Sequence, residues 1–281
     1  MHPIRLPVCA EDRSRPMTKD FTLFLWLLKL GALVNLYFLA GTLGFRPGEA
    51  DPHIVVPAQI LFVVCGYRCL LPNRYENNVV LHASPLSSAL VTRVLATFAE
   101  VAWIYQFSHV IRLLNVEQVA WVEALSWLMV VQVVVSQLFV WGAIVTGRLW
   151  LYVYEEFGWA VIFLANSIAS AWLYLNVDVP GGSEVLLQAN LLFGLVYLPW
   201  QIFHLRALRA EARVHDETTP PPPRVTPRLF ASHLRGSLFE WNRATDAASW
   251  GGLIGLTWMT AYWATLIPFW VHGVVKLAAT P

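Results

Sequence analysis

The chain has 281 residues, of which 57% are hydrophobic and only 13% are charged, and its formal net charge is +1. Because a typical soluble domain carries about 25% charged residues, this composition argues against a soluble globular enzyme and predicts an all-α, polytopic membrane protein. The sequence contains no phosphate-cradling glycine loop, zinc-peptidase motif or nucleophile elbow. Nucleic-acid binding gains no support either, because basic residues flanking apolar segments have a simpler explanation in membrane topology.

Seven apolar segments follow one another along the chain, and each is long enough to cross about 30 Å of hydrocarbon as a helix. They lie near residues 21–44, 53–71, 85–114, 118–146, 149–176, 183–207 and 250–277. We therefore expect residues 1–281 to form one transmembrane domain, a seven-helix bundle with a polar cytoplasmic segment at 208–249.

The distribution of lysine and arginine predicts how this bundle is oriented. With a cytoplasmic N-terminus, the inner segments hold fourteen basic residues: Arg5, Arg13, Arg15, Lys19, Arg68, Arg74, Arg148, Arg206, Arg209, Arg213, Arg224, Arg228, Arg235 and Arg243. The outer segments hold three: Arg46, Arg112 and Lys276. Basic residues beside spans prefer the cytoplasm, so we expect the N-terminus inside and the C-terminus outside, in a bacterial cytoplasmic membrane.

The polar segment before the last span contains a helix-start signal. Thr226 is a suitable N-cap, and Pro227 follows at the first helical position. Apolar residues then recur at helical spacing with arginines among them, a pattern typical of an amphipathic helix on the inner membrane surface. The alternative is a helix packed against the cytoplasmic ends of the bundle.

Four charged residues within the spans share one level. Counted from the inner membrane face, Lys29, Arg93, Glu155 and Glu156 all lie at a depth of about 10–12 Å, at 1.5 Å per residue. Charges inside spans are costly, and they usually face partners or a site. We expect these residues to form either a polar site open to the cytoplasm or a structural ion-pair network.

Glu100 lies deeper, near the midplane, two turns from Arg93 on the same helical face. With no basic residue at its own depth, it is expected to be neutral or to bond to Asn35, Asn166 or a ligand. One interpretation is a proton-carrying carboxyl, and the other is a hydrogen-bonded structural residue.

The segment between the second and third spans, residues 67–88, is rich in polar groups. We predict that it covers or lines the mouth of the inner cluster. Substrate contacts are expected from the cationic and loop residues Lys29, Arg68, Arg74, Tyr75, Glu76 and Arg93. Catalytic roles are expected for the carboxylates and one histidine: Glu100, Glu155, Glu156 and His82.

Histidines near the outer face raise the alternative of a bound cofactor. His109 and His272 lie at similar depths, with Glu123 nearby, and could ligate a haem or a metal ion. Their spacing is not the short-range kind usual for metal sites, so the sequence assigns no metal and leaves the cofactor open. Deep residues among the 14 tryptophans either pack helices or line a pocket for a flat or long apolar ligand.

Three classes of function remain. The first binds or modifies a lipid-like or isoprenoid-like substrate with an anionic head group at the cytoplasmic face. The second is a proton or cation transporter or channel that uses Glu100. The third is a non-catalytic or cofactor-binding subunit of a larger membrane complex. Expected partners are membrane lipids, together with other subunits or further copies of the chain.

Overall fold

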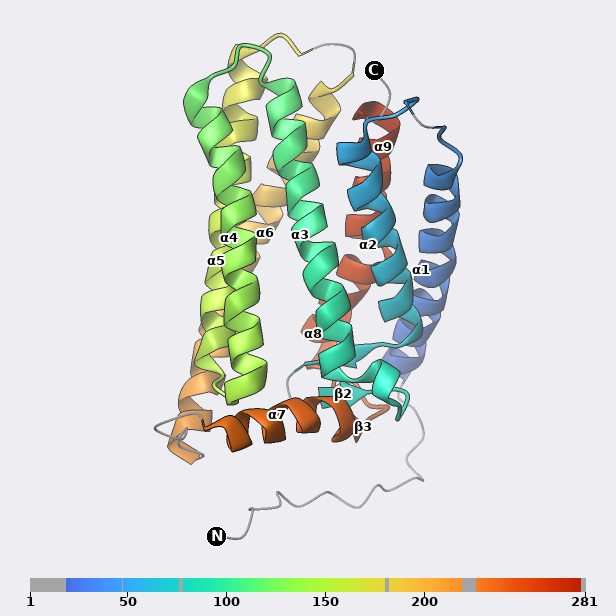
Figure 1. Cartoon of the computed structure of the whole chain (residues 1–281), viewed down its shortest axis with the longest axis vertical. Helices are drawn as coiled ribbons and strands as arrows, with labels where there is room; N and C mark the ends of the chain where they lie inside the picture. Colours follow the sequence, from blue (N-terminus) through green and yellow to red (C-terminus); the bar gives the residue numbers. More distant parts are fainter. Residues whose placement is uncertain (1–18, 47, 76–77, 180–181, 219–225, 279–281) are drawn as a thin grey trace.

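The computed structural model describes residues 19–46, 48–75, 78–179, 182–218 and 226–278, and they form a bundle of long, nearly parallel helices (Figure 1). Six helices within these ranges are long and apolar enough to cross a membrane. They are α1 (Lys19–Leu43), α2 (Pro52–Leu70), α3 (Ala89–Leu114), α4 (Ala120–Thr146), α5 (Trp150–Asn176) and α6 (Glu184–Thr218). Most bounds agree with the predicted spans to within two residues.

Two of the predicted bounds were wrong. The sixth span was expected to end at residue 207, but α6 continues to Thr218 because the polar residues that follow are good helix formers. The third was expected to start at residue 85, but Pro85 begins a separate 3₁₀ turn, η2 (Pro85–Ser87), with Ser84 as its N-cap. Ser88 is the N-cap of α3, and its hydroxyl accepts a hydrogen bond from the backbone N–H of Val91.

The predicted seventh span is divided into three parts. They are α8 (Gly252–Met259), a π-helix η3 (Thr260–Ala264) and α9 (Leu266–Ala278). A π-helix leaves carbonyl groups without their usual partners. The carbonyl of Trp263 accepts hydrogen bonds from Asn35 Nδ2 (2.9 Å) and from the thiol of Cys69 (3.5 Å). Side chains of α1 and α2 therefore support the π-helix, and the buried Cys69 is a free thiol.

Gly31 permits α1 to approach η3 closely. A Cβ atom built on Gly31 would lie 2.3 Å from the Cβ of Ala264, which is far closer than two side chains can come. The close approach also positions Asn35, one helical turn further along α1, beside the carbonyl that it binds.

We call the end of the bundle that carries α7 and the three short strands the lower end, and the opposite end the upper end (Figure 1). The strands β1 (Asn73–Arg74), β2 (Val79–Val80) and β3 (Asn242–Arg243) form a small sheet in that order. β1 pairs antiparallel with β2, and β2 pairs parallel with β3. The connection between α2 and α3 is thereby fixed to the segment that precedes α8.

α7 (Pro227–Phe239) crosses the lower ends of α3 and α4 (Figure 1). The predicted start is confirmed, because the Thr226 hydroxyl accepts a hydrogen bond from the backbone N–H of Leu229 (3.2 Å). Asn78 holds the other end, since its Nδ2 donates to the carbonyls of Ser237 (3.2 Å) and Glu240 (3.0 Å). No residue of α7 is fully buried.

Candidate functional site

A cavity of about 350 Å³ lies in the lower half of the bundle. Its walls come from the lower end of α2, β1, α3, α5, α6, α8 and η3. Trp103 and Phe163 are the lining residues furthest toward the upper end on α3 and α5. Ala207 on α6 and Ile254 on α8 line the cavity and are also exposed, so the cavity opens between these two helices.

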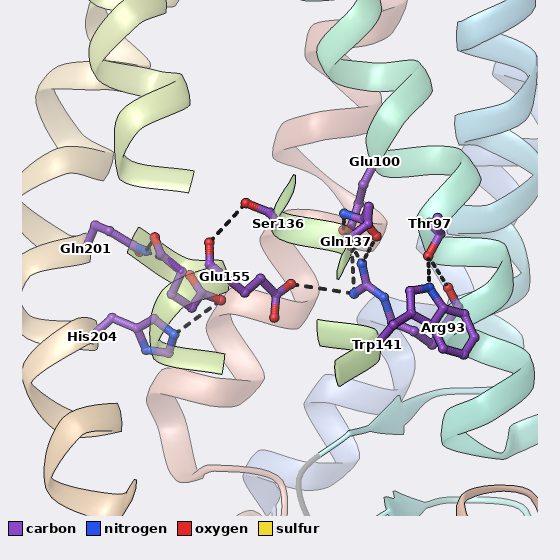
Figure 2. Close-up of polar contacts among 10 residues, drawn as sticks. Arg93, Thr97, Glu100, Ser136, Gln137, Trp141, Glu155, Gln201 and His204 are labelled. Atoms are coloured by element: carbon purple, nitrogen blue, oxygen red, sulfur yellow. Dashed lines mark hydrogen bonds and ion pairs between the residues drawn. The ribbon is translucent and has the colours of Figure 1, made fainter. Parts of the chain in front are cut away.

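Arg93 is the centre of a buried charged group (Figure 2). Its Nη2 lies 2.6 Å from Glu100 Oε2, and its Nη1 lies 3.7 Å from Glu155 Oε1. Gln137 on α4 joins the pair, because its Nε2 donates to Glu100 Oε2 (3.0 Å) and its Oε1 accepts from Arg93. The side chains of Arg93 and Glu100 are 1% and 5% exposed, so water cannot replace these contacts.

This arrangement corrects the expectation that no basic residue reaches Glu100. The α-carbon of Arg93 lies two turns lower, but its long side chain extends along α3 to the carboxylate. The two asparagines offered as partners bind elsewhere. Asn35 donates to backbone carbonyls, and Asn166 accepts from Asn190 Nδ2 (3.5 Å) on α6.

Glu156 on α5 forms a second polar contact in the cavity, with Gln201 and His204 of α6, which are both labelled in Figure 2. Its Oε2 accepts a hydrogen bond from Gln201 Nε2 (2.8 Å), and its Oε1 lies 3.6 Å from His204 Nε2. The sequence interpretation did not single out Gln201 or His204. The sequence does contain a signal, because these two residues share a helical face of α6 with Tyr197 and Glu211. His204, Tyr197 and Glu211 line the cavity.

Arg68 faces the same cavity from the end of α2. The residue is 5% exposed, and its guanidinium carbon lies 4.2 Å from the ring centre of Trp263 and 5.1 Å from that of Tyr75. Such contacts favour a cation but do not neutralise it. Within the described residues, Arg68 has no carboxylate in ion-pair range and its Nε–H has no acceptor.

Further lining residues carry buried donors that lack acceptors within the described ranges. They are the hydroxyl of Tyr75 and the indole N–H groups of Trp103 and Trp263. Burial raises the pKa of Tyr75, so its hydroxyl keeps its proton at neutral pH. Buried polar groups normally have hydrogen-bond partners. These unpaired donors would therefore suit a ligand that carries several hydrogen-bond acceptors.

The structure brings together most of the predicted site residues. Eight of the ten lie in the described ranges near the lower end, as follows: Arg68, Arg74, Tyr75, Arg93, Glu100, Glu155 and Glu156 line the cavity, whereas His82 does not. His82 is exposed on the loop before η2. Glu76 lies outside the described residues.

Lys29 is the tenth predicted residue, and the structure does not bring it to the cluster. It is exposed on the outward face of α1, with its Nζ 4.7 Å from the ring centre of Trp26. Its depth agrees with that of Arg93, but it points in a different direction.

The two histidines near the upper end differ in their surroundings, because His109 has a polar partner, whereas the buried Nδ1 of His272 has none within the described residues. His109 Nε2 lies 2.7 Å from Asp51 Oδ2, and the ring of His272 stacks on Phe38 with centres 4.0 Å apart. Glu123 is exposed in the first turn of α4. Across the described parts of the chain, no three His, Cys, Asp or Glu side chains are grouped closely enough to hold a metal ion.

Comparisons of the chain with protein-family models, with curated proteins and with solved structures found no match.

Proposed function

We propose that this integral membrane protein binds a lipid-like or isoprenoid-like molecule with an anionic head group in the lower cavity. The proposed topology has seven spans, with α8, η3 and α9 together forming the seventh. The lower end then faces the cytoplasm, in keeping with the fourteen basic residues assigned to that side and the three assigned to the other.

Arg68 is the observation that carries the proposal. Burying a guanidinium without a counter-ion is costly, and such a group is normally paired. An anionic head group placed beside Arg68 would supply the missing charge, and its oxygens would accept from Tyr75 and Trp263. Arg74 lines the same wall, where its Nη1 donates to the carbonyl of Ser249 (3.3 Å).

The remaining walls suit an apolar tail. Tryptophan and tyrosine rings line the cavity, and the stacked pair Trp200 and Trp258 joins α6 to α8 with ring centres 4.7 Å apart. Below this pair, the opening between α6 and α8 gives a chain direct access from the side of the bundle. A ligand of this type is expected to enter laterally and leave its tail between the two helices.

The position of Glu156 and His204 supports a role in proton transfer when the bound molecule is transformed. Both groups line the cavity, with His204 Nε2 3.6 Å from Glu156 Oε1, so each is placed to exchange a proton with a molecule bound there. Glu100 is a weaker choice for this role and for proton transport, because its carboxylate is held by Arg93 and Gln137.

The test is to identify the lipids that remain bound to the purified protein, by native mass spectrometry in a mild uncharged detergent. The wild type is expected to retain an anionic or phosphate-containing amphiphile, and Arg68→Gln is expected to lose it. Arg46→Gln, on an exposed residue near the upper end, is the matched control. Equal retention by wild type and Arg68→Gln, with both proteins folded, would refute the proposal.

A further inference from the structure

The lower cavity has walls of opposite charge. Arg68 and Arg74 line it from α2 and β1, whereas Glu156 and Glu211 line it from α5 and α6. Arg93, Glu100 and Glu155 also line the cavity, but Arg93 is paired with both carboxylates. Aromatic rings line the same cavity, including those of Trp258 on α8 and Tyr262 on η3. The basic residues and the acidic residues thus come from different elements of the bundle but line the same cavity.

The acidic wall retains acceptor capacity. One oxygen of Glu156 accepts from Gln201, and the other lies 3.6 Å from His204, longer than a hydrogen bond. Glu211 is exposed, two turns beyond His204 on the same face of α6, and it has no ion pair within the described residues. Carboxylates beside aromatic rings favour a cationic group in a ligand.

A ligand that is only anionic does not satisfy both walls. Its charge would be paired at Arg68 but would face the carboxylates of Glu156 and Glu211 across the same cavity. Repulsion of this kind is stronger in a partly desolvated space than in water. A ligand that also carries an amine would be paired at both walls, with no net charge to bury.

We infer that the ligand is a zwitterionic amphiphile, whose phosphate or other anionic group lies at Arg68 and whose ammonium group lies between Glu156 and Glu211. This inference rests on the proposed function and narrows it to one class of head group. The rings of Trp200 and His204 stack on each other beside these carboxylates.

Comparing the binding of two short-chain lipids separates the contribution of the basic residues from that of the acidic residues. Dihexanoyl phosphatidylethanolamine and dihexanoyl phosphatidylglycerol carry the same phosphodiester and similar head-group sizes, but only the first has an amine. Binding of each to the full chain in maltoside micelles is measured by titration calorimetry. The wild type is expected to bind the ethanolamine lipid about tenfold more tightly, which corresponds to about 1.4 kcal/mol.

Variants at the two walls should respond differently. Glu211→Gln is expected to weaken binding of the ethanolamine lipid about fivefold and to leave binding of the glycerol lipid unchanged or tighter, an estimate based on one exposed charge pair. Arg68→Gln should weaken both lipids, because both carry the phosphate. Glu217→Gln, an exposed residue of α6 outside the cavity, is the matched control and should change neither.

The two proposals fail in different ways. If the wild type binds both lipids equally and Glu211→Gln changes neither, the zwitterion inference is overturned, and a loss with Arg68→Gln would still support the anionic site. If neither lipid binds, or if Arg68→Gln binds both as the wild type does, the proposed function fails together with the inference. Because Glu211 is exposed, its substitution tests recognition without disturbing the core.

Discussion

Replacing Arg93 by methionine is expected to destabilise the protein strongly. The substitution preserves most of the side-chain volume but leaves the carboxylates of Glu100 and Glu155, 4% and 7% exposed, without the cation between them. Removing one partner of a buried ion pair typically costs about 3–5 kcal/mol. For 281 residues, an unfolding entropy of about 2.1 cal/mol/K per residue converts that loss into a fall in Tm of roughly 5–9 °C.

The assay is thermal unfolding of the detergent-solubilised protein, followed by intrinsic tryptophan fluorescence. Lys29→Met is the matched control, because Lys29 matches Arg93 in predicted depth but is exposed on α1, and its Tm should not fall. Glu100→Gln should cost less than Arg93→Met, since Arg93 keeps Glu155. A Tm for Arg93→Met equal to that of the control would refute the reasoning that this cation holds the buried carboxylates.

Two further predictions concern the upper end of the bundle and the contact between α1 and the last helix. Asp51→Asn keeps a hydrogen-bond acceptor at the start of α2 but removes the charge beside His109. Burial raises the pKa of Asp51, but hydrogen bonds from His109 and a backbone N–H outweigh it and lower the pKa below its ordinary value of 3.8. This stabilisation is present above pH 3.8 and lost as the pH falls further, so the Tm difference between wild type and variant should shrink from pH 5 to pH 3; a constant difference would contradict this. Gly31→Ala should lower Tm by several degrees, because the added methyl group would collide with Ala264. Gly41→Ala is the control and should leave Tm unchanged, because the space around Gly41 is open. Equal Tm values for these two variants would contradict the close approach of α1 to η3.

The sequence predicts the membrane bundle well because the signal is simple. Long apolar segments are read directly from composition, and the observed helices follow them closely. The division of the last span was not predictable in this way. The π-helix depends on hydrogen bonds from Asn35 and Cys69, which belong to other helices and become neighbours only in the folded chain.

Only some of the predicted site residues lie together in the structure. Counting residues gives the depth of a side chain but not the direction in which it points around the helix. Lys29 and Arg93 have the same depth, yet one is exposed and the other is fully buried. α1 is apolar on nearly every side, so its sequence does not define an inward face.

The length of the arginine side chain explains the error at Glu100. The depth estimate placed each charge at its α-carbon, and a guanidinium can lie several ångströms away from that point. His204 was missed because its partner is on another helix, so the pair has no spacing in the sequence. Its helical face, shared with Gln201 and Glu211, is nevertheless present as a spacing pattern in the sequence.

The π-helix also has a consequence for biogenesis. The carbonyl of Trp263 is satisfied by α1 and α2, which leave the ribosome long before residues 260–264 are made. The donors on Asn35 and Cys69 are therefore synthesised before the carbonyl that they bind. Trp258, Tyr262 and Trp263 reach the cavity on that last segment, so the binding site is completed only when the last helix docks, and a chain that lacks it would present an open groove in place of a pocket.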